Sequence, residues 1–142
     1  MQLTTPRVAV VAVAAAAVLA GCGDSAEETA TTQVCTARDD IAQHVDALKG
    51  TTVTTATTTD VKDRLQAIRQ DLSKIADARG DLSDDNRQQV ETANDAFRTT
   101  VRETAQTVLR TTSVEEAGTQ LEAALQQLAA TYRDTFAQVD CS

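Results

Sequence analysis

The chain has 142 residues, a formal net charge of −8 and a composition that is 42% hydrophobic but only 2% aromatic. This length fits one domain with a terminal extension, and a core of small and aliphatic side chains favours closely packed helices over a roomy ligand cavity. Because 21 acidic residues outnumber 13 basic ones, nucleic acid and anionic lipid head groups should repel the domain. Any attachment to a membrane must therefore be covalent.

The first 21 residues have the features of a secretory signal peptide. Arg7 is the only charged side chain among them, and Val8 to Leu19 form an unbroken apolar run, VAVVAVAAAAVL. A membrane-spanning helix needs about 20 apolar residues, so this shorter run is typical of the hydrophobic region of a signal peptide. We expect residues 1–21 to be removed as a signal peptide.

The residues that end this segment, Leu19-Ala20-Gly21-Cys22, resemble the lipobox of bacterial lipoproteins, Leu-small-small-Cys. The resemblance implies that the Cys22 thiol receives a diacylglyceryl group and that the signal is cut directly before this residue. Two acyl chains, such as palmitate, anchor a protein stably at about 0.8 kcal/mol per buried CH₂. The implied location is the extracytoplasmic face of the cell membrane. The alternative is an ordinary secretory signal, cut after Ala20 or nearby, with a coincidental cysteine.

Residues 22–34 are expected to be the lipidated cysteine and a flexible linker. Gly23 to Gln33, GDSAEETATTQ, are small, polar and acidic without an apolar period, which is typical of a disordered tether. As a coil, such a tether spans about 20 Å on average. It would hold the domain off the lipid surface without fixing its orientation.

Residues 35–142 are predicted to form a helical bundle domain, because apolar residues recur there at α-helical spacing in four stretches. The stretches are Val34, Ile41, Val45 and Leu48; Val61, Leu65, Ile68, Leu72 and Ile75; Val90, Ala93, Phe97, Val101, Ala105 and Val108; and Val114, Ala117, Leu121, Leu125, Leu128, Tyr132, Phe136 and Val139. The second stretch alternates spacings of four and three, as the a/d seam of a coiled coil does.

Several residues mark the predicted helix ends. Asp60, Ser83 and Ser113 are the expected N-caps, and Ser113 opens a Ser-x-x-Glu capping box. Gly50 and Gly80 lie where the first two helices should end.

The threonine-rich stretch TTVTTATTT, Thr51–Thr59, separates the first two predicted helices. It is expected to be an extended connection, because threonine is β-branched and a poor helix former. The alternative is that this stretch is O-glycosylated, as threonine-rich tracts of exported proteins sometimes are.

Cys35 and Cys141 are expected to form a disulfide, because they remain as a pair once Cys22 carries lipid and disulfides persist outside the cytoplasm. Two free thiols or a metal pair are the alternatives. Short connections favour antiparallel neighbours, and four antiparallel helices bring the start of the first and the end of the last to one end. We therefore predict an all-α, antiparallel up-down-up-down four-helix bundle.

The stretches CTARDDIAQHVDALKG and DVKDRLQAIRQDL, with the threonine-rich link between them, resemble a group of small secreted helical proteins and lipoproteins of actinobacteria. Members of the group begin their domain with a cysteine and close it with a near-terminal one. The resemblance covers the layout from Cys35 to Cys141 and implies the same architecture, without an associated activity.

The only histidine, His44, lies on a helix with Asp40 and close to Asp46. Structural zinc usually has four ligands, and di-iron bundles use paired Glu-x-x-His motifs; neither pattern occurs here. We expect a solvated surface histidine, no metal site and no cofactor.

Acidic doublets occur at Asp39-Asp40, Asp84-Asp85 and Glu115-Glu116. Each falls in the first turn of a predicted helix, where negative charge favours the helix dipole, so capping explains them better than catalysis. Aromatic residues on the core stripes are likewise expected to pack rather than to line a ligand slot; they are Phe97, Tyr132 and Phe136.

No catalytic set of nucleophile, acid and base is recognisable in the sequence, so an enzyme is not predicted. The preferred function is a non-enzymatic structural or interaction module, anchored to the membrane through Cys22, whose acidic helix faces contact an envelope protein partner. The alternative is a binding or carrier protein for an apolar envelope ligand. A carrier would need a pocket of several hundred cubic ångströms among the stripe residues.

Overall fold

The computed structural model describes residues 22–54, 57–110 and 114–142, with side chains described from residue 26 onward and, in the last range, from residue 118. The predicted signal peptide and Ser113 lie outside these ranges. Within them the chain forms the helices α1 (Cys22–Lys49), α2 (Thr58–Ala78), α3 (Asp84–Arg110) and α4 (Val114–Thr135), and the 3₁₀ turns η1 (Arg79–Asp81) and η2 (Phe136–Gln138). No strand occurs in the described ranges, which confirms the all-α class.

The flexible linker predicted for residues 22–34 is wrong, because α1 already begins at Cys22 and runs for 28 residues. Ala30 and Val34 are both buried, and they continue the stripe of Ile41 and Val45 toward the N-terminus. The alanine of this stripe is too small to give a clear apolar period in the sequence. Burial of Ala30 and Val34 stabilises this part of α1 by tertiary packing, and this gain exceeds the loss from the low helix propensity of the polar residues around them.

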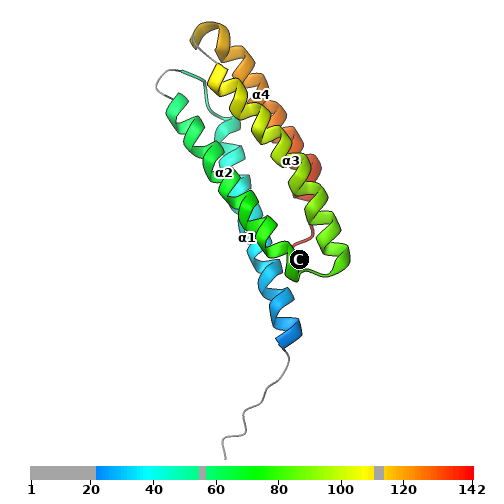
Figure 1. Ribbon diagram of the computed structural model, residues 1–142. Coiled ribbons are helices and arrows are strands. Elements are labelled where there is room, and N and C mark those ends of the chain that lie inside the picture. The colour runs from blue at the N-terminus through cyan, green and yellow to red at the C-terminus, as the bar shows by residue number, and fades with distance from the viewer. Residues whose placement is uncertain (1–21, 55–56, 111–113) are drawn as a thin grey trace, which may run out of the picture.

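The four helices lie side by side, and α1 extends past the others at one end of the molecule (Figure 1). Helix α1 packs against α2 and α4, and α3 packs against the same two helices. The α1–α2 and α3–α4 pairs contact each other more extensively than the α2–α3 and α1–α4 pairs. The seam between α2 and α3 is therefore one of the two looser ones.

The core is built from the predicted apolar stripes of all four helices. Its largest fully buried side chains are Phe97, Phe136, Ile41, Leu48, Ile68, Leu72, Ile75, Leu121, Leu128, Val34, Val61 and Val101. Three aromatic rings cluster within it: Phe97 meets Tyr132 and Phe136 edge to face, with ring centroids 5.7 and 5.6 Å apart. This edge-to-face arrangement is the one that aromatic quadrupoles favour.

The helix ends differ from the predicted caps in two places. Helix α2 begins at Thr58, so Asp60 lies inside its first turn and pairs with Arg64 at 2.9 Å rather than capping the helix. The same helix ends at Ala78 and continues as η1, so Gly80 lies within a 3₁₀ turn. Ser83 immediately precedes α3, and its carbonyl accepts the Arg87 N–H at 2.8 Å, as expected of an N-cap residue.

The threonine-rich connection has no regular structure from Thr51 to Thr54, although Thr58 and Thr59 already belong to α2. The Thr57 hydroxyl accepts the Thr54 N–H at 2.8 Å and donates to the Thr52 carbonyl at 2.9 Å. Val53 is buried against the core. Side-chain hydrogen bonds and one apolar anchor thus fix the described part of this connection.

One buried carboxylate depends on a single cation. Asp71 of α2 is buried, and Lys74, which is exposed, donates to it at 2.6 Å. The hydrogen bond to Asp71, and then its charge, raise the pKa of Lys74 above the ordinary 10.5. The protonated amine therefore stabilises the folded state fully below pH 10.5, and this contribution is lost as the pH rises through the raised pKa.

Replacing Lys74 with methionine is expected to lower the melting temperature by a few degrees at neutral pH, because a buried carboxylate without its partner is destabilising. Lys74→Arg, which keeps the charge, is the matched control and should retain most of the stability. Urea unfolding at neutral pH and above pH 11 provides the test, since the difference between wild type and Lys74→Met should shrink at the higher pH. A difference that stays constant would show that the ion pair does not contribute.

Candidate interaction site between α2 and α3

A disulfide joins the C-terminal segment that follows η2 to α1. Cys35 and Cys141 are bonded, with their Cα atoms 5.8 Å apart across a sequence separation of 106 residues. This pairing confirms the predicted bridge. Cys35, however, lies well inside α1 rather than at its start, because the helix begins at Cys22.

Hydrogen bonds beside the disulfide hold the same segments together. The Arg38 guanidinium donates to the Val139 carbonyl at 2.8 Å, and Gln89 of α3 donates to the Gln138 carbonyl at 3.2 Å. The Tyr132 hydroxyl donates to the Arg38 carbonyl at 3.2 Å, so this half-buried phenol has a hydrogen-bond partner. Burial raises the pKa of Tyr132, so the phenol keeps the proton that this bond needs. These contacts form a structural clamp.

His44 is half-buried rather than solvated, which corrects the expectation from the sequence. It lies three residues after Ile41 and four before Leu48, so the helix places its ring at the edge of the core. Its Nδ1 is buried and has no hydrogen-bond partner among the described residues. Within the same residues, no group of three or more His, Cys, Asp or Glu side chains is arranged to hold a metal ion.

The acidic doublets have different surroundings. Asp84 and Asp85 lie in the first turn of α3, as predicted. Asp39 and Asp40 lie in the middle of α1, so the explanation through the helix dipole is wrong for them; Asp39 pairs with Arg38 at 3.0 Å instead. The side chains of Glu115 and Glu116, in the first turn of α4, are not described.

An open groove of about 760 Å³ follows the seam between α2 and α3. Helix α2 contributes its middle two turns and α3 its C-terminal half. The lining residues are Gln66, Arg69, Gln70, Leu72 and Ser73 from α2, and Arg98, Val101, Arg102, Ala105, Gln106 and Leu109 from α3. Leu72 and Val101 belong to the core, so the floor of the groove is apolar and its rims are polar.

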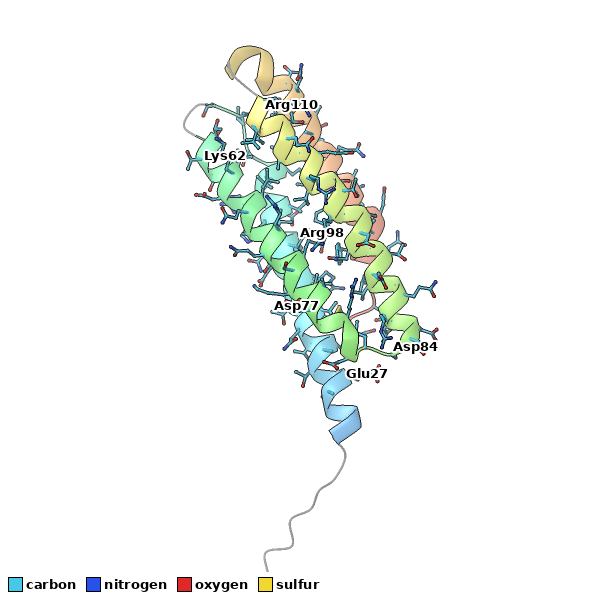
Figure 2. The ribbon with its side chains drawn as sticks, viewed as in Figure 1. Glu27, Lys62, Asp77, Asp84, Arg98 and Arg110 are labelled. Carbon is cyan, nitrogen blue, oxygen red and sulfur yellow. A yellow bond between two sulfur atoms is a disulfide. The ribbon has the colours of Figure 1, made fainter. Side chains whose placement is uncertain are left out.

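The rims of the groove carry positive charge only. Arg69, Arg98 and Arg102 line it, and no Asp or Glu does so among the described residues. None of these arginines forms an ion pair within the described ranges. The arginines that do form one there are Arg38, Arg64, Arg79 and Arg87. Figure 2 places Arg98 at the seam between α2 and α3. Three unpaired cations thus share one groove in a protein of net charge −8.

The groove also contains an exposed apolar side chain. Leu109 is 73% exposed and is the only large hydrophobic residue of the described chain that is so exposed. By contrast, a smaller groove between α1 and α2 mixes Lys74 with Asp40 and Asp77. The α2–α3 groove therefore differs from its neighbour in combining one sign of charge with exposed apolar surface.

The sequence pattern alone does not reveal this groove. Arg98 and Arg102 are four residues apart, which is a weak signal of a cationic face; Asp95, three residues before Arg98, could pair with it by spacing, and only the structure shows that it does not. Leu109 follows the stripe residue Val108 and lies off the predicted core face. Arg69 comes from another helix, and only the packing of α2 against α3 brings it to the same groove.

Cys22, the predicted lipidation site, is the first residue of α1, and its side chain is not among those described. No helix within the described ranges is both long enough and apolar enough to cross a membrane. Comparisons with protein-family models, curated proteins and solved structures found no match to this chain.

Proposed function

We propose that this protein is a lipid-anchored, non-enzymatic interaction module on the extracytoplasmic face of the cell membrane, with the α2–α3 groove as its contact surface. The observation that carries the proposal is the set of three unpaired arginines in one groove with the exposed Leu109. A membrane location is supported by the lipobox-like residues Leu19-Ala20-Gly21-Cys22 directly after an apolar run. The proposed contact surface is therefore the basic α2–α3 groove, in place of the acidic helix faces that the sequence suggested.

The finer architecture that we propose is an antiparallel, up-down-up-down four-helix bundle. Contacts at both ends of the helices support it. At one end, Glu27 near the start of α1 accepts the Ser83 N–H before α3 at 3.2 Å, and Cys141 after α4 is bonded to Cys35. At the other end, Lys49 at the end of α1 shares a hollow with Glu122 in the first half of α4.

An anchor on Cys22 would place the domain on a rigid support rather than on a flexible tether. Helix α1 starts at Cys22 and contacts η1, and the twelve residues from there to Val34 extend about 18 Å as a helix. The groove, which runs along the helices, would then be held above the membrane at a height that α1 fixes. This geometry favours display of a binding surface to a partner in the envelope.

A non-enzymatic role is supported by the side chains that line the groove. Arginine and glutamine bind anions and amides, whereas acyl or glycosyl transfer requires a nucleophile or acid positioned with a base. Ser73 is the only hydroxyl on the described lining, and neither histidine nor carboxylate lines the groove with it. The lining is suited to recognition.

Changing Cys22 to serine is expected to abolish acylation and to release the protein from the membrane fraction. The full chain would be expressed in a bacterium fed an alkyne-tagged fatty acid, followed by detergent phase partitioning and in-gel detection of the label. Gly21→Ala, which keeps a small residue before the cysteine, is the matched control and should remain labelled and anchored. A Cys22→Ser protein that still partitions quantitatively with membranes would contradict the anchor.

A carrier for an apolar envelope ligand is the second candidate function, favoured by one observation. The groove has the volume of a small-molecule site, and its floor includes the core residues Leu72 and Val101. Mass spectrometry of the protein purified in mild detergent separates the two functions. A stoichiometric lipid beyond the anchor would support the carrier, and its absence would support the interaction module.

A further inference from the structure

We propose that the α2–α3 groove binds an acidic amphipathic helix of a partner protein, which lies along the seam as a fifth helix. This inference deepens the proposed function and rests on it, since it names the class of partner. It is drawn from the charge of the rims, the exposed leucine and the length of the groove. Each of these restricts what the groove can hold.

The charge of the rims requires an anionic occupant. Arg98 and Arg102 are one turn apart on α3, where like charges repel and destabilise a helix, and Arg69 faces the same groove from α2. Acidic residues are abundant in this chain, yet none among the described residues lines the groove or pairs with these arginines. Guanidinium groups bind carboxylates in bidentate geometry. A carboxylate-bearing partner would neutralise the repulsion.

The exposed leucine of the groove favours apolar side chains on the same occupant. Leu109 is 73% exposed, and Ala105, one turn before it on α3, is only partly buried. Leu72 and Val101 line the groove from beneath but are already fully buried in the free protein. In helix-in-groove recognition, apolar anchors on the bound helix at i, i+3, i+4 and i+7 cover exposed apolar surface of this kind.

The length of the groove fits a helix better than a small anion. From Arg98 to Leu109 the groove follows eleven residues of α3, which is about 16 Å at 1.5 Å per residue. A single phosphate or carboxylate would engage only one turn of this surface and would leave Leu109 uncovered. A helix of three or more turns would reach both the arginines and the leucine.

Other occupants from the same cell surface fit less well. The described side chains of a second copy present no exposed apolar stripe, because Leu109 is the only large exposed hydrophobic among them. Residues 1–21 carry no acidic side chain. Lipid head groups at the anchor would lie far from the groove. Val90 of α3 lines a hollow with Cys35 of α1, so these two residues are at the same level of the bundle. Arg98 lies about 12 Å from Val90 along α3, and Cys22 lies about 20 Å from Cys35 along α1 in the opposite direction.

The test uses the full chain and a synthetic amphipathic peptide about eighteen residues long. The peptide carries leucines at helical a/d spacing and glutamates at the neighbouring positions. Fluorescence anisotropy at low and high salt measures its binding. The Arg98→Gln/Arg102→Gln variant should bind about tenfold more weakly, and Leu109→Gln should bind several-fold more weakly. The melting temperature of the arginine variant should stay equal or rise slightly, because the repulsion on α3 is removed.

Matched controls separate the groove from general charge. Lys62→Gln/Arg133→Gln makes the same change in net charge at exposed residues outside the groove lining and should bind the peptide as wild type does. Peptides with lysine in place of glutamate, or with glutamine in place of leucine, should not bind. Equal binding of the peptide to wild type and to the Arg98→Gln/Arg102→Gln variant would overturn the inference. It would also be overturned if none of a panel of acidic peptides, which differ in the helical positions of their leucines, bound the wild-type protein.

Two further outcomes would identify another occupant and also overturn the inference. Dodecanoate or phosphatidylglycerol vesicles that compete through the same arginines would show that the groove takes an anionic lipid. Concentration-dependent dimerisation that Leu109→Gln abolishes would show that it takes a second copy. Because the anchor is tested separately by labelling at Cys22, failure of the groove and failure of the proposed location are distinguishable.

Discussion

The double change Cys35→Ser/Cys141→Ser is expected to lower the melting temperature by about 10 °C. The bond closes a loop with a sequence separation of 106 residues, and disulfides that close long loops typically contribute 2–4 kcal/mol, up to roughly 4.7 in the chain-entropy model. For a domain of this size, each kcal/mol shifts the melting temperature by about 4 °C. Thermal unfolding followed by far-UV circular dichroism measures the change.

Reduction provides the control for this experiment. Wild type treated with a reductant should melt like the double variant, and the variant itself should not respond to the reductant. Cys22→Ser alone should melt like wild type, because Cys22 is not part of the bond. Identical melting curves for wild type and the double variant, or two free thiols in an unreduced Cys22→Ser protein, would show that Cys35 and Cys141 do not pair.

Phe97→Ala is expected to reduce the free energy of unfolding by about 3–5 kcal/mol. Phe97 has no solvent exposure, and its ring contacts both Tyr132 and Phe136. Truncation removes the largest side chain of α3 from the core and leaves a cavity between α3 and α4, which rigid helices fill only partly. Urea unfolding monitored by circular dichroism measures the loss.

Leu109→Ala is the matched control for the change at Phe97. It also shortens an apolar side chain on α3, but Leu109 is 73% exposed, so its unfolding free energy should change by less than about 0.5 kcal/mol. Comparable losses for the two variants would mean that Phe97 does not occupy the core as the structure places it. A large loss for Phe97→Ala alone confirms the packing of α3 against α4.

The sequence by itself determined the helical class, the four helices and the disulfide. Apolar residues such as Leu65, Ile68 and Leu72 recur at the spacing that places side chains on one face of a helix, and each of them is buried. Pairing of Cys35 with Cys141 followed from counting the cysteines of a chain that we expect to be exported. These features depend on local periodicity and on composition, which are properties of the sequence alone.

Tertiary structure decided where α1 begins. The residues from Cys22 to Gln33 have the composition of a disordered segment, yet they form the first turns of α1, and Ala30 is buried there against the rest of the bundle. His44 became half-buried for a similar reason, because its place at the edge of the stripe matters only when another helix lies beside it. Burial depends on neighbours that are distant in sequence.

The candidate site was also beyond the reach of the sequence. Arg98 and Arg102 were visible as a pair, but Arg69 joins them from a helix about thirty residues earlier in the chain, through the packing of α2 against α3. Whether an arginine is paired depends on which side chains the fold places within about 4 Å of it. Spacing along the chain determines which face a residue occupies, whereas only the packed helices determine what that face meets.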